Sequence, residues 1–224
     1  MLFIVSTPIG NLKDITFRAV ETLKSVDLIA AEDTRHSQIL LKAYDIHTPL
    51  TSYYEHNEFS KSKYLLDLLR SGRNIAVVTD AGTPGISDPG YALIKLAREN
   101  NIPVTVIPGP AALIAALSLS GAPAHSFIFE GFLPVKPGAR QKKILEFKNE
   151  ERTIIFYEAP HRVLKTLEDI KDVLSDPIVI CAREITKKFE EIQKGRASEL
   201  IVHFSQKPPK GEFVIILNRG EALP

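Results

Sequence analysis

The chain has 224 residues, 44% hydrophobic and 25% charged, which is the composition of a globular protein long enough to bury a sizeable core. Its formal net charge of +1 excludes a strong basic field over the whole molecule, so a polyanion would have to meet a local patch. No apolar run reaches the roughly 20 residues of a membrane span, and the N-terminus lacks the basic region of a signal peptide. We therefore expect a cytoplasmic protein with no membrane association, in which the single cysteine, Cys181, is a buried thiol within an apolar run.

The first half of the chain alternates short β-branched apolar runs with amphipathic stretches. Strands are predicted to begin at Leu2, Leu28, Ile75 and Val104. Helices are predicted near Ile15–Val26, His36–Tyr44, Glu58–Ser71 and Gly90–Asn100. Strands that alternate with helices favour parallel βαβ units. The strands read as continuous apolar runs, which indicates a sheet buried on both faces.

The second half has a different pattern. Strands are predicted to begin at Phe127, Thr153, Pro177, Phe189 and Glu212, and helices near Arg140–Lys148, His161–Leu174 and Ala197–Phe204. Because only a short segment joins the strands around Val179 and Ile192, some antiparallel pairing is expected. The stretch "SLSGAPA" breaks the pattern at Ser118–Ala124, so we expect two α/β domains, 1–117 and 118–224.

Four loops rich in glycine or proline follow predicted strands, at Thr7–Asn11, Asp80–Gly90, Ile107–Gly121 and Tyr157–Arg162. In open α/β sheets ligands bind beyond the carboxyl ends of strands, so these loops can converge on one cleft, although each alone could be an ordinary connection. The second and third loops contain no Lys or Arg, and the second carries Asp80 and Asp88, which argues against a phosphate ligand. Such a loop suits a ligand with hydroxyls, an amine or a cationic centre.

Two further features of these loops bear on the ligand. The six histidines are scattered without a ligand spacing, so no metal site is predicted. Ala111 and Ala112 would leave room for a flat apolar group such as adenine, or they could simply be the tightly packed start of a helix.

The motifs "TPIGN", "DAGTPGISDPG", "IPGPAALIAAL" and "FYEAPHR" closely resemble the tetrapyrrole-methylase superfamily of S-adenosylmethionine-dependent methyltransferases. "AEDTRHS" and "KGEFVIIL" resemble its ribosomal RNA small subunit methyltransferase I branch. The resemblance implies an N-terminal domain with a mostly parallel sheet, a C-terminal domain with a mixed sheet, a cofactor in the cleft between them, and a homodimer. The residues that it assigns to S-adenosylmethionine are Pro8, Asp80, Ala81, Gly82, Ile86, Ser87, Ala111, Ala112, Glu158 and Gly195.

The branch implies 2′-O-methylation of a cytidine ribose in 16S ribosomal RNA of the small subunit. The alternatives are methylation of a tetrapyrrole ring carbon, as in cobalamin or siroheme precursors, and an RNA-binding module without catalysis. Longer members of the branch carry an extra C-terminal segment, whereas this chain stops soon after its last predicted strand. RNA contacts made by such a segment are expected to be absent or replaced.

Methyl transfer to a ribose hydroxyl needs in-line positioning, helped by a general base or an orienting cation. The candidates are Glu32, Asp33 and Arg35 after the second predicted strand, and Lys187 in the charged run "REITKKFEE". Asp33 and Arg35 could instead form a pair that braces the strand end. Charge runs are also often solvated faces.

The run "VKPGARQKK" is the strongest local basic patch, and we expect Lys136, Arg140, Lys142 and Lys143 to contact RNA phosphates, unless they form a solvated helix face. Tyr53, Tyr54 and His56 could stack on an unpaired base, or they could be surface and core residues of a loop.

Overall fold

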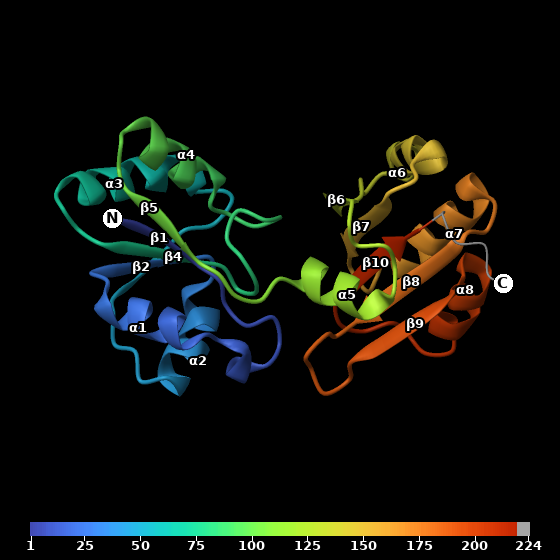
Figure 1. The fold of residues 1–224 in the computed structure, drawn as a ribbon, viewed down its shortest axis with the longest axis horizontal. Coiled ribbons are helices and arrows are strands. Elements are labelled where there is room, and N and C mark those ends of the chain that lie inside the picture. Colours follow the sequence, from blue (N-terminus) through green and yellow to red (C-terminus); the bar gives the residue numbers. More distant parts are fainter. Residues whose placement is uncertain (219–224) are drawn as a thin grey trace. The chain divides into compact units, whose positions relative to one another are not determined.

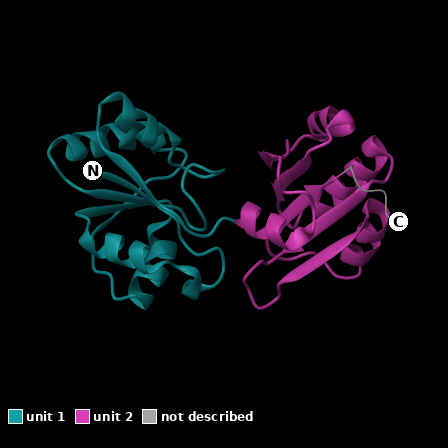
Figure 2. Cartoon of the chain, viewed as in Figure 1, with its two compact units in different colours: residues 1–111 teal, residues 112–224 magenta. Residues whose placement is uncertain are grey.

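The computed structural model describes residues 1–218. The chain divides into two compact units, residues 1–111 and residues 112–224, coloured separately in Figure 2. The expected division between residues 117 and 118 would cut helix α5 (Ala112–Ser120), whereas the observed division precedes this helix.

Unit 1 is built on a parallel sheet with the strand order β3-β2-β4-β1-β5 (Figure 1). The strands are β1 (Leu2–Val5), β2 (Leu28–Ala31), β3 (Leu50–Ser52), β4 (Ile75–Val78) and β5 (Val104–Ile107). Four of them match the predicted parallel strands. The sequence did not indicate β3, because three residues with a polar end carry no apolar periodicity.

The helices of unit 1 cover both faces of this sheet, as the continuous apolar runs predicted. They are α1 (Phe17–Ser25), α2 (Thr34–Ala43), α3 (Glu58–Arg70) and α4 (Tyr91–Glu99), with a short 3-10 turn at Leu12–Asp14. Alternate residues of β4 enter different cores: Ala76 and Val78 join residues of α1 and α2, whereas Ile75 and Val77 join residues of α3 and α4. Helices α1 and α2 therefore cover one face and α3 and α4 the other (Figure 1).

The described part of unit 2 holds a mixed sheet with the order β6-β7-β10-β8-β9. Its strands are β6 (Phe127–Phe132), β7 (Thr153–Glu158), β8 (Ile178–Arg183), β9 (Glu191–Arg196) and β10 (Phe213–Leu217). Strands β6 and β7 are parallel, and the remaining neighbours pair antiparallel, including β8 with β9 as expected. The predicted mixed sheet is confirmed.

Helices α6 (Pro137–Glu146), α7 (Val163–Leu174) and α8 (Ala197–Ser205) contribute to one core with this sheet, and a 3-10 turn at Phe147–Asn149 follows α6. Helix α5 packs against β7, β8, β9 and β10. Cys181 is buried in β8, and burial raises the pKa of its thiol, so it is a structural residue as expected.

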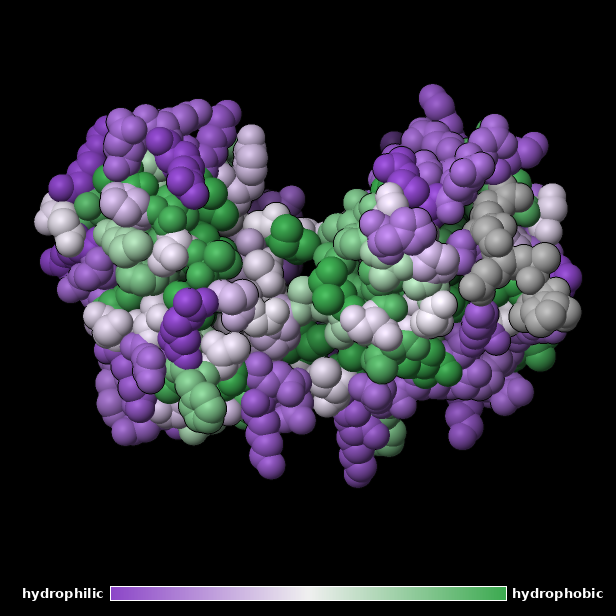
Figure 3. Space-filling view, in the orientation of Figure 1, coloured by the Kyte–Doolittle hydropathy of each residue, from purple (hydrophilic) through white to green (hydrophobic). Residues whose placement is uncertain are grey.

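On the face drawn in Figure 3, hydrophilic residues of both units are interspersed with apolar patches. Within residues 1–218, no helix combines the length and the apolar character that crossing a bilayer requires.

Candidate functional site

The loops that follow β1, β4 and β5 are tied together at the carboxyl edge of the unit 1 sheet. The Thr7 N–H donates to the Gly82 carbonyl at 2.8 Å, and the Gly82 N–H donates back to the Thr7 carbonyl at 3.1 Å. The Ser6 and Thr83 hydroxyls lie 2.8 Å apart, and Thr83 Oγ1 donates to the Pro110 carbonyl at 3.2 Å. These bonds bring together the loops that carry Pro8, Asp80–Ser87 and Ala111, so three of the four predicted loops share one edge.

The loop Asp80–Gly90 is closed by contacts that require glycine. The Gly85 N–H donates to the Pro89 carbonyl at 3.1 Å. At Gly90 the φ angle is 147°, and a Cβ would lie 2.9 Å from the Gly85 nitrogen, closer than real contacts allow. Gly82 has a φ of +89°, a region that β-branched residues avoid. The closed loop leaves Ile86 and Ser87 exposed at its tip.

A carboxylate that the sequence did not single out anchors the far end of this loop. Glu58 Oε1 accepts hydrogen bonds from Gly90 N at 2.9 Å, from Ala92 N at 3.0 Å and from the Tyr53 hydroxyl at 3.1 Å. Tyr53 is fully buried and its hydroxyl also accepts from Leu93 N, so it is a core residue and cannot stack on a base. In the sequence Glu58 looks like any acidic residue in the first turn of a helix.

Glu32 and Asp80 follow the neighbouring strands β2 and β4, and two hydrogen bonds tie these strand ends together. The Asp80 N–H donates to Glu32 Oε2 at 3.3 Å, and the Asp33 N–H donates to Asp80 Oδ1 at 3.1 Å. Burial raises the pKa of Glu32; the Asp80 N–H opposes this shift and the Asp80 charge adds to it. Glu32 is therefore a better proton acceptor than an ordinary surface carboxylate.

Asp33 has a different role, because it caps helix α2. Its Oδ1 accepts from Arg35 N at 2.8 Å, and its Oδ2 lies 2.8 Å from the Arg35 guanidinium. The side-chain and main-chain hydrogen bonds of Arg35 hold the pKa of Asp33 far below its usual range. Asp33 is thus a weak base, whereas the Arg35 side chain remains 90% exposed and open to a further anion.

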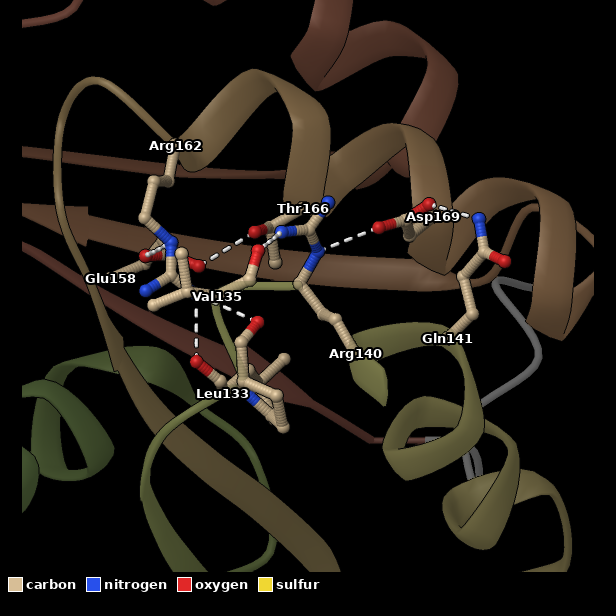
Figure 4. A network of polar contacts seen from close by, with 9 residues as sticks. Leu133, Val135, Arg140, Gln141, Glu158, Arg162, Thr166 and Asp169 are labelled. Carbon is tan, nitrogen blue, oxygen red and sulfur yellow. Dashed lines mark hydrogen bonds and ion pairs between the residues drawn. The ribbon is translucent and has the colours of Figure 1, made fainter. Parts of the chain in front are cut away.

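The fourth predicted loop belongs to unit 2, where Glu158 is part of a buried polar network (Figure 4). Its carboxylate accepts from Ala159 N at 2.8 Å and from Thr166 Oγ1 at 2.6 Å, and it lies 3.2 Å from Arg162 Nε. Arg162 also donates to the Leu133 carbonyl at 2.7 Å. Because the Glu158 carboxylate has internal partners and is 2% exposed, a ligand at this position would meet the main chain.

Arg140 was predicted to contact RNA, and the structure corrects this prediction. The residue is 4% exposed; its Nε donates to Asp169 Oδ2 at 2.6 Å and its NH1 to the Val135 carbonyl at 3.2 Å (Figure 4). Arg140 lies on the buried side of helix α6, and the buried Asp169 of α7 compensates its charge. Arg140 holds the loop between β6 and α6 and cannot reach a polyanion.

The three lysines of the same run are not equivalent. Lys143 Nζ lies 2.9 Å from Glu130 and 3.0 Å from Glu146, and hydrogen bonds to these carboxylates raise its pKa. Lys136 and Lys142 are exposed, and no carboxylate within residues 1–218 pairs with either. The basic patch expected from four residues is thus reduced to these two free charges.

Lys187 and Gly195 have structural partners in unit 2. Lys187 Nζ donates to Glu184 Oε1 at 2.8 Å and to Glu212 Oε2 at 2.9 Å. Burial acts to lower its pKa, but these two bonds raise it overall, so Lys187 stays protonated and cannot act as a base. Gly195 lies in β9, where a Cβ would stand 2.8 Å from the carboxylate of Glu199.

Comparison with known proteins finds relatives that match nearly the whole chain. A protein from Synechocystis sp. named Ribosomal RNA small subunit methyltransferase I is 51% identical over 218 residues, 97% of this chain and 78% of the relative. A protein of the same name from Thermotoga maritima is 48% identical over 221 residues, 98% of this chain and 99% of the relative.

Two solved structures share the fold. The uroporphyrin-III C-methyl transferase from Thermus thermophilus complexed with S-adenyl homocysteine has a TM-score of 0.68 at 18% identity, covering 98% of this chain and 97% of that one. A diphthine synthase has a TM-score of 0.73 at 12% identity, covering 97% and 89%. The family described as Tetrapyrrole (Corrin/Porphyrin) Methylases matches residues 1–201. Because this family model covers most of the chain and the two named relatives match nearly all of it, the chain belongs to the tetrapyrrole methylase family.

Proposed function

We propose that this protein transfers a methyl group from S-adenosylmethionine to the 2′-oxygen of a cytidine ribose in 16S ribosomal RNA of the small subunit. Methyl transfer to ribosomal RNA is supported by relatives of that name at 51% and 48% identity over nearly the whole chain. The choice of a cytidine 2′-oxygen rests on the resemblance of "AEDTRHS" and "KGEFVIIL" to the small-subunit methyltransferase branch.

The residues at the edge of unit 1 fit the proposed cofactor. S-adenosylmethionine supplies an electrophilic methyl group on a sulfonium when it is bound. The loops Asp80–Gly90 and Ile107–Gly121 contain no Lys or Arg that would repel this cation. Asp80 uses Oδ1 for the Asp33 N–H, and the described residues offer no donor to its Oδ2, which can accept from a hydroxyl or amine.

The proposed cofactor contacts fall into two groups. Those of unit 1 are Pro8, Asp80, Ala81, Gly82, Ile86, Ser87 and Ala111, and those of unit 2 are Ala112, Glu158 and Gly195. Ala111 and Ala112 are small and half-buried, which supports the assignment of a flat ring to their neighbourhood.

Glu32 is the carboxylate to which we assign the ribose proton. The hydrogen bond from Asp80 N fixes its position, and its raised pKa makes it the stronger base of the pair Glu32 and Asp33. The exposed guanidinium of Arg35 is assigned to a phosphate of the RNA, which it can bind through two N–H groups. Lys187 is assigned a structural role: its hydrogen bond to Glu212 stabilises the β8–β9 connection.

The deciding experiment is methyl transfer from labelled S-adenosylmethionine to isolated small ribosomal subunits, followed by nucleoside analysis. The proposal expects the label in 2′-O-methylcytidine, in a dinucleotide that resists alkaline hydrolysis. Label on a base, or no transfer to subunits or naked 16S RNA, would contradict it.

Two rival functions make different predictions. A tetrapyrrole methylase would transfer the label to a porphyrinogen or corrin substrate, but the solved structures with such names are 16–19% identical and indicate the fold alone. A non-catalytic module would bind RNA and not S-adenosylmethionine, which calorimetry with the cofactor decides. A homodimer and a cytoplasmic location stay predictions, and light scattering tests the first.

A further inference from the structure

Several aromatic side chains are exposed where helices α3 and α4 begin. Phe59 is 78% exposed, Tyr91 is 68% exposed and Tyr54 is 42% exposed. Large aromatic side chains are mostly buried in a globular domain, and their exposure in one place marks a binding surface more often than chance. The Tyr54 ring lies edge-on to His56, with the ring centroids 6.4 Å apart, and none of the three rings takes part in the proposed methyl transfer.

Glu58 links the main-chain segments that carry these residues. Its Oε1 accepts from Gly90 N and Ala92 N, the two main-chain groups on either side of Tyr91. Phe59 is the residue after Glu58. Tyr54 follows Tyr53, whose hydroxyl donates to the same carboxylate oxygen. The three exposed aromatics are therefore each one residue from a group bonded to Glu58 or from Glu58 itself, and we call Tyr54, Phe59 and Tyr91 the ring surface.

The ring surface lies at the edge of the sheet where the reaction is proposed. Strand β3 leads into α3 and strand β4 into α4, so both helices start at the carboxyl edge of the parallel sheet. Tyr91 directly follows the loop Asp80–Gly90, and Glu58 bonds that loop to α3. A nucleotide on these rings would lie next to a ribose presented to Glu32 at the end of β2.

The charges around the ring surface are compatible with RNA and too weak to bind it alone. Lys61 Nζ lies 4.8 Å from the centre of the Tyr64 ring, and Lys63 is exposed with no carboxylate partner within residues 1–218. Farther along the same helices two cations are paired, Arg70 with Asp67 at 3.6 Å and Lys95 with Glu99 at 3.9 Å. Because Glu55 lies in the same loop, stacking must supply most of the affinity.

We propose that the ring surface, with Lys61 and Lys63 beside it, binds unpaired nucleotides of ribosomal RNA that flank the methylated residue. Single-stranded RNA is recognised chiefly by stacking of splayed bases on aromatic side chains, and lysines at the margin then meet the phosphates. The proposal rests on the proposed function, because only an RNA substrate brings unpaired bases to this edge. A second copy of the chain is the competing occupant.

The test compares Tyr91→Ala and Phe59→Ala with two controls. Tyr91→Phe keeps the ring, and Phe17→Ala removes a ring that is 90% exposed at the start of α1, on the other face of the sheet. Alanine at a stacking position weakens binding of one base roughly 5- to 150-fold. We expect KM for small subunits to rise by a factor in this range in both alanine variants, with kcat, S-adenosylmethionine affinity and melting temperature unchanged. Both controls should match wild type.

Binding of a fluorescein-labelled single-stranded oligocytidylate is measured on the same variants, together with their mass by light scattering. Unchanged KM and unchanged oligonucleotide affinity in both alanine variants would overturn the proposal, and so would a shift of either variant to a smaller species. If wild type transfers no methyl group to ribosomal RNA, the proposed function fails. The oligonucleotide then still decides the ring surface, because loss of binding in Tyr91→Ala and not in Tyr91→Phe needs no turnover.

Discussion

Replacing Glu32 by glutamine should remove the proton acceptor and keep the geometry. The amide oxygen of Gln can still accept from Asp80 N, so the bond at 3.3 Å between the ends of β2 and β4 survives. Removal of a general base lowers the rate about 10²–10⁴-fold, which corresponds to ~2.7–5.4 kcal/mol of transition-state stabilisation. We expect this loss in single-turnover methyl transfer to small subunits, with unchanged affinity for S-adenosylmethionine.

The stability of Glu32→Gln separates a catalytic role from a structural one. The pKa of Glu32 in the folded state is raised above its usual value of 4.5. At pH values between 4.5 and the raised pKa, the folded state therefore holds more protons than the unfolded state. The free energy of unfolding of wild type therefore falls as pH rises through this window, and ionised Glu32 destabilises the fold at pH 7. The glutamine variant lacks this penalty and should unfold at the same or a higher urea concentration than wild type.

The pH profile and a matched control complete the experiment. Wild-type turnover should fall as pH drops through the raised pKa of Glu32, and the variant should not show this limb. Asp33→Asn is the control: asparagine caps a helix as well as aspartate does, and the lost pair with Arg35 is exposed, so turnover should stay within a few-fold. Turnover near wild type in Glu32→Gln, or an equal loss in Asp33→Asn, would refute the assignment.

Three further changes test separate parts of the structure. Arg140→Ala should lower the free energy of unfolding in urea by about 3–5 kcal/mol, because it leaves the Asp169 carboxylate buried without its cation; a fully stable variant with weakened RNA binding would restore the original prediction for Arg140. Lys142→Glu should leave the melting temperature unchanged and reduce the magnitude of the log–log salt slope of RNA binding by roughly 0.7–0.9 or more, whereas an unchanged slope assigns this lysine to solvent. Gly82→Val should weaken S-adenosylmethionine binding in calorimetry, because valine disfavours a φ of +89°; a folded variant with wild-type affinity removes the loop from the site.

Local sequence patterns predict the order of most strands and helices in unit 1. Continuous apolar runs at Leu2, Leu28, Ile75 and Val104 indicate strands buried on both faces, and the structure has them as parallel neighbours. The glycines of "DAGTPGISDPG" likewise indicate a tight loop after a strand. Helix α5 was not separated from the glycine loop before it, because its apolar residues are spread around the helix and show no helical period.

The roles of individual polar residues were not determined by the sequence. Arg140 and Lys142 are two positions apart in one basic run. Arg140 is buried and hydrogen-bonded to Asp169, whereas Lys142 is exposed. Glu32 and Asp33 are adjacent carboxylates, and only the tertiary structure shows that the pKa of Glu32 is raised and that Asp33 caps α2.

The sequence by itself therefore determined the fold class, because backbone propensity and apolar periodicity act over a few neighbouring residues, and its motifs resembled those of the family. Only the tertiary structure decided which charges are free, which are buried and which carboxylate has a raised pKa. Those properties depend on desolvation and on partners that can lie far away in the chain: Asp169 is 29 residues from Arg140, and Glu32 is 48 residues from Asp80.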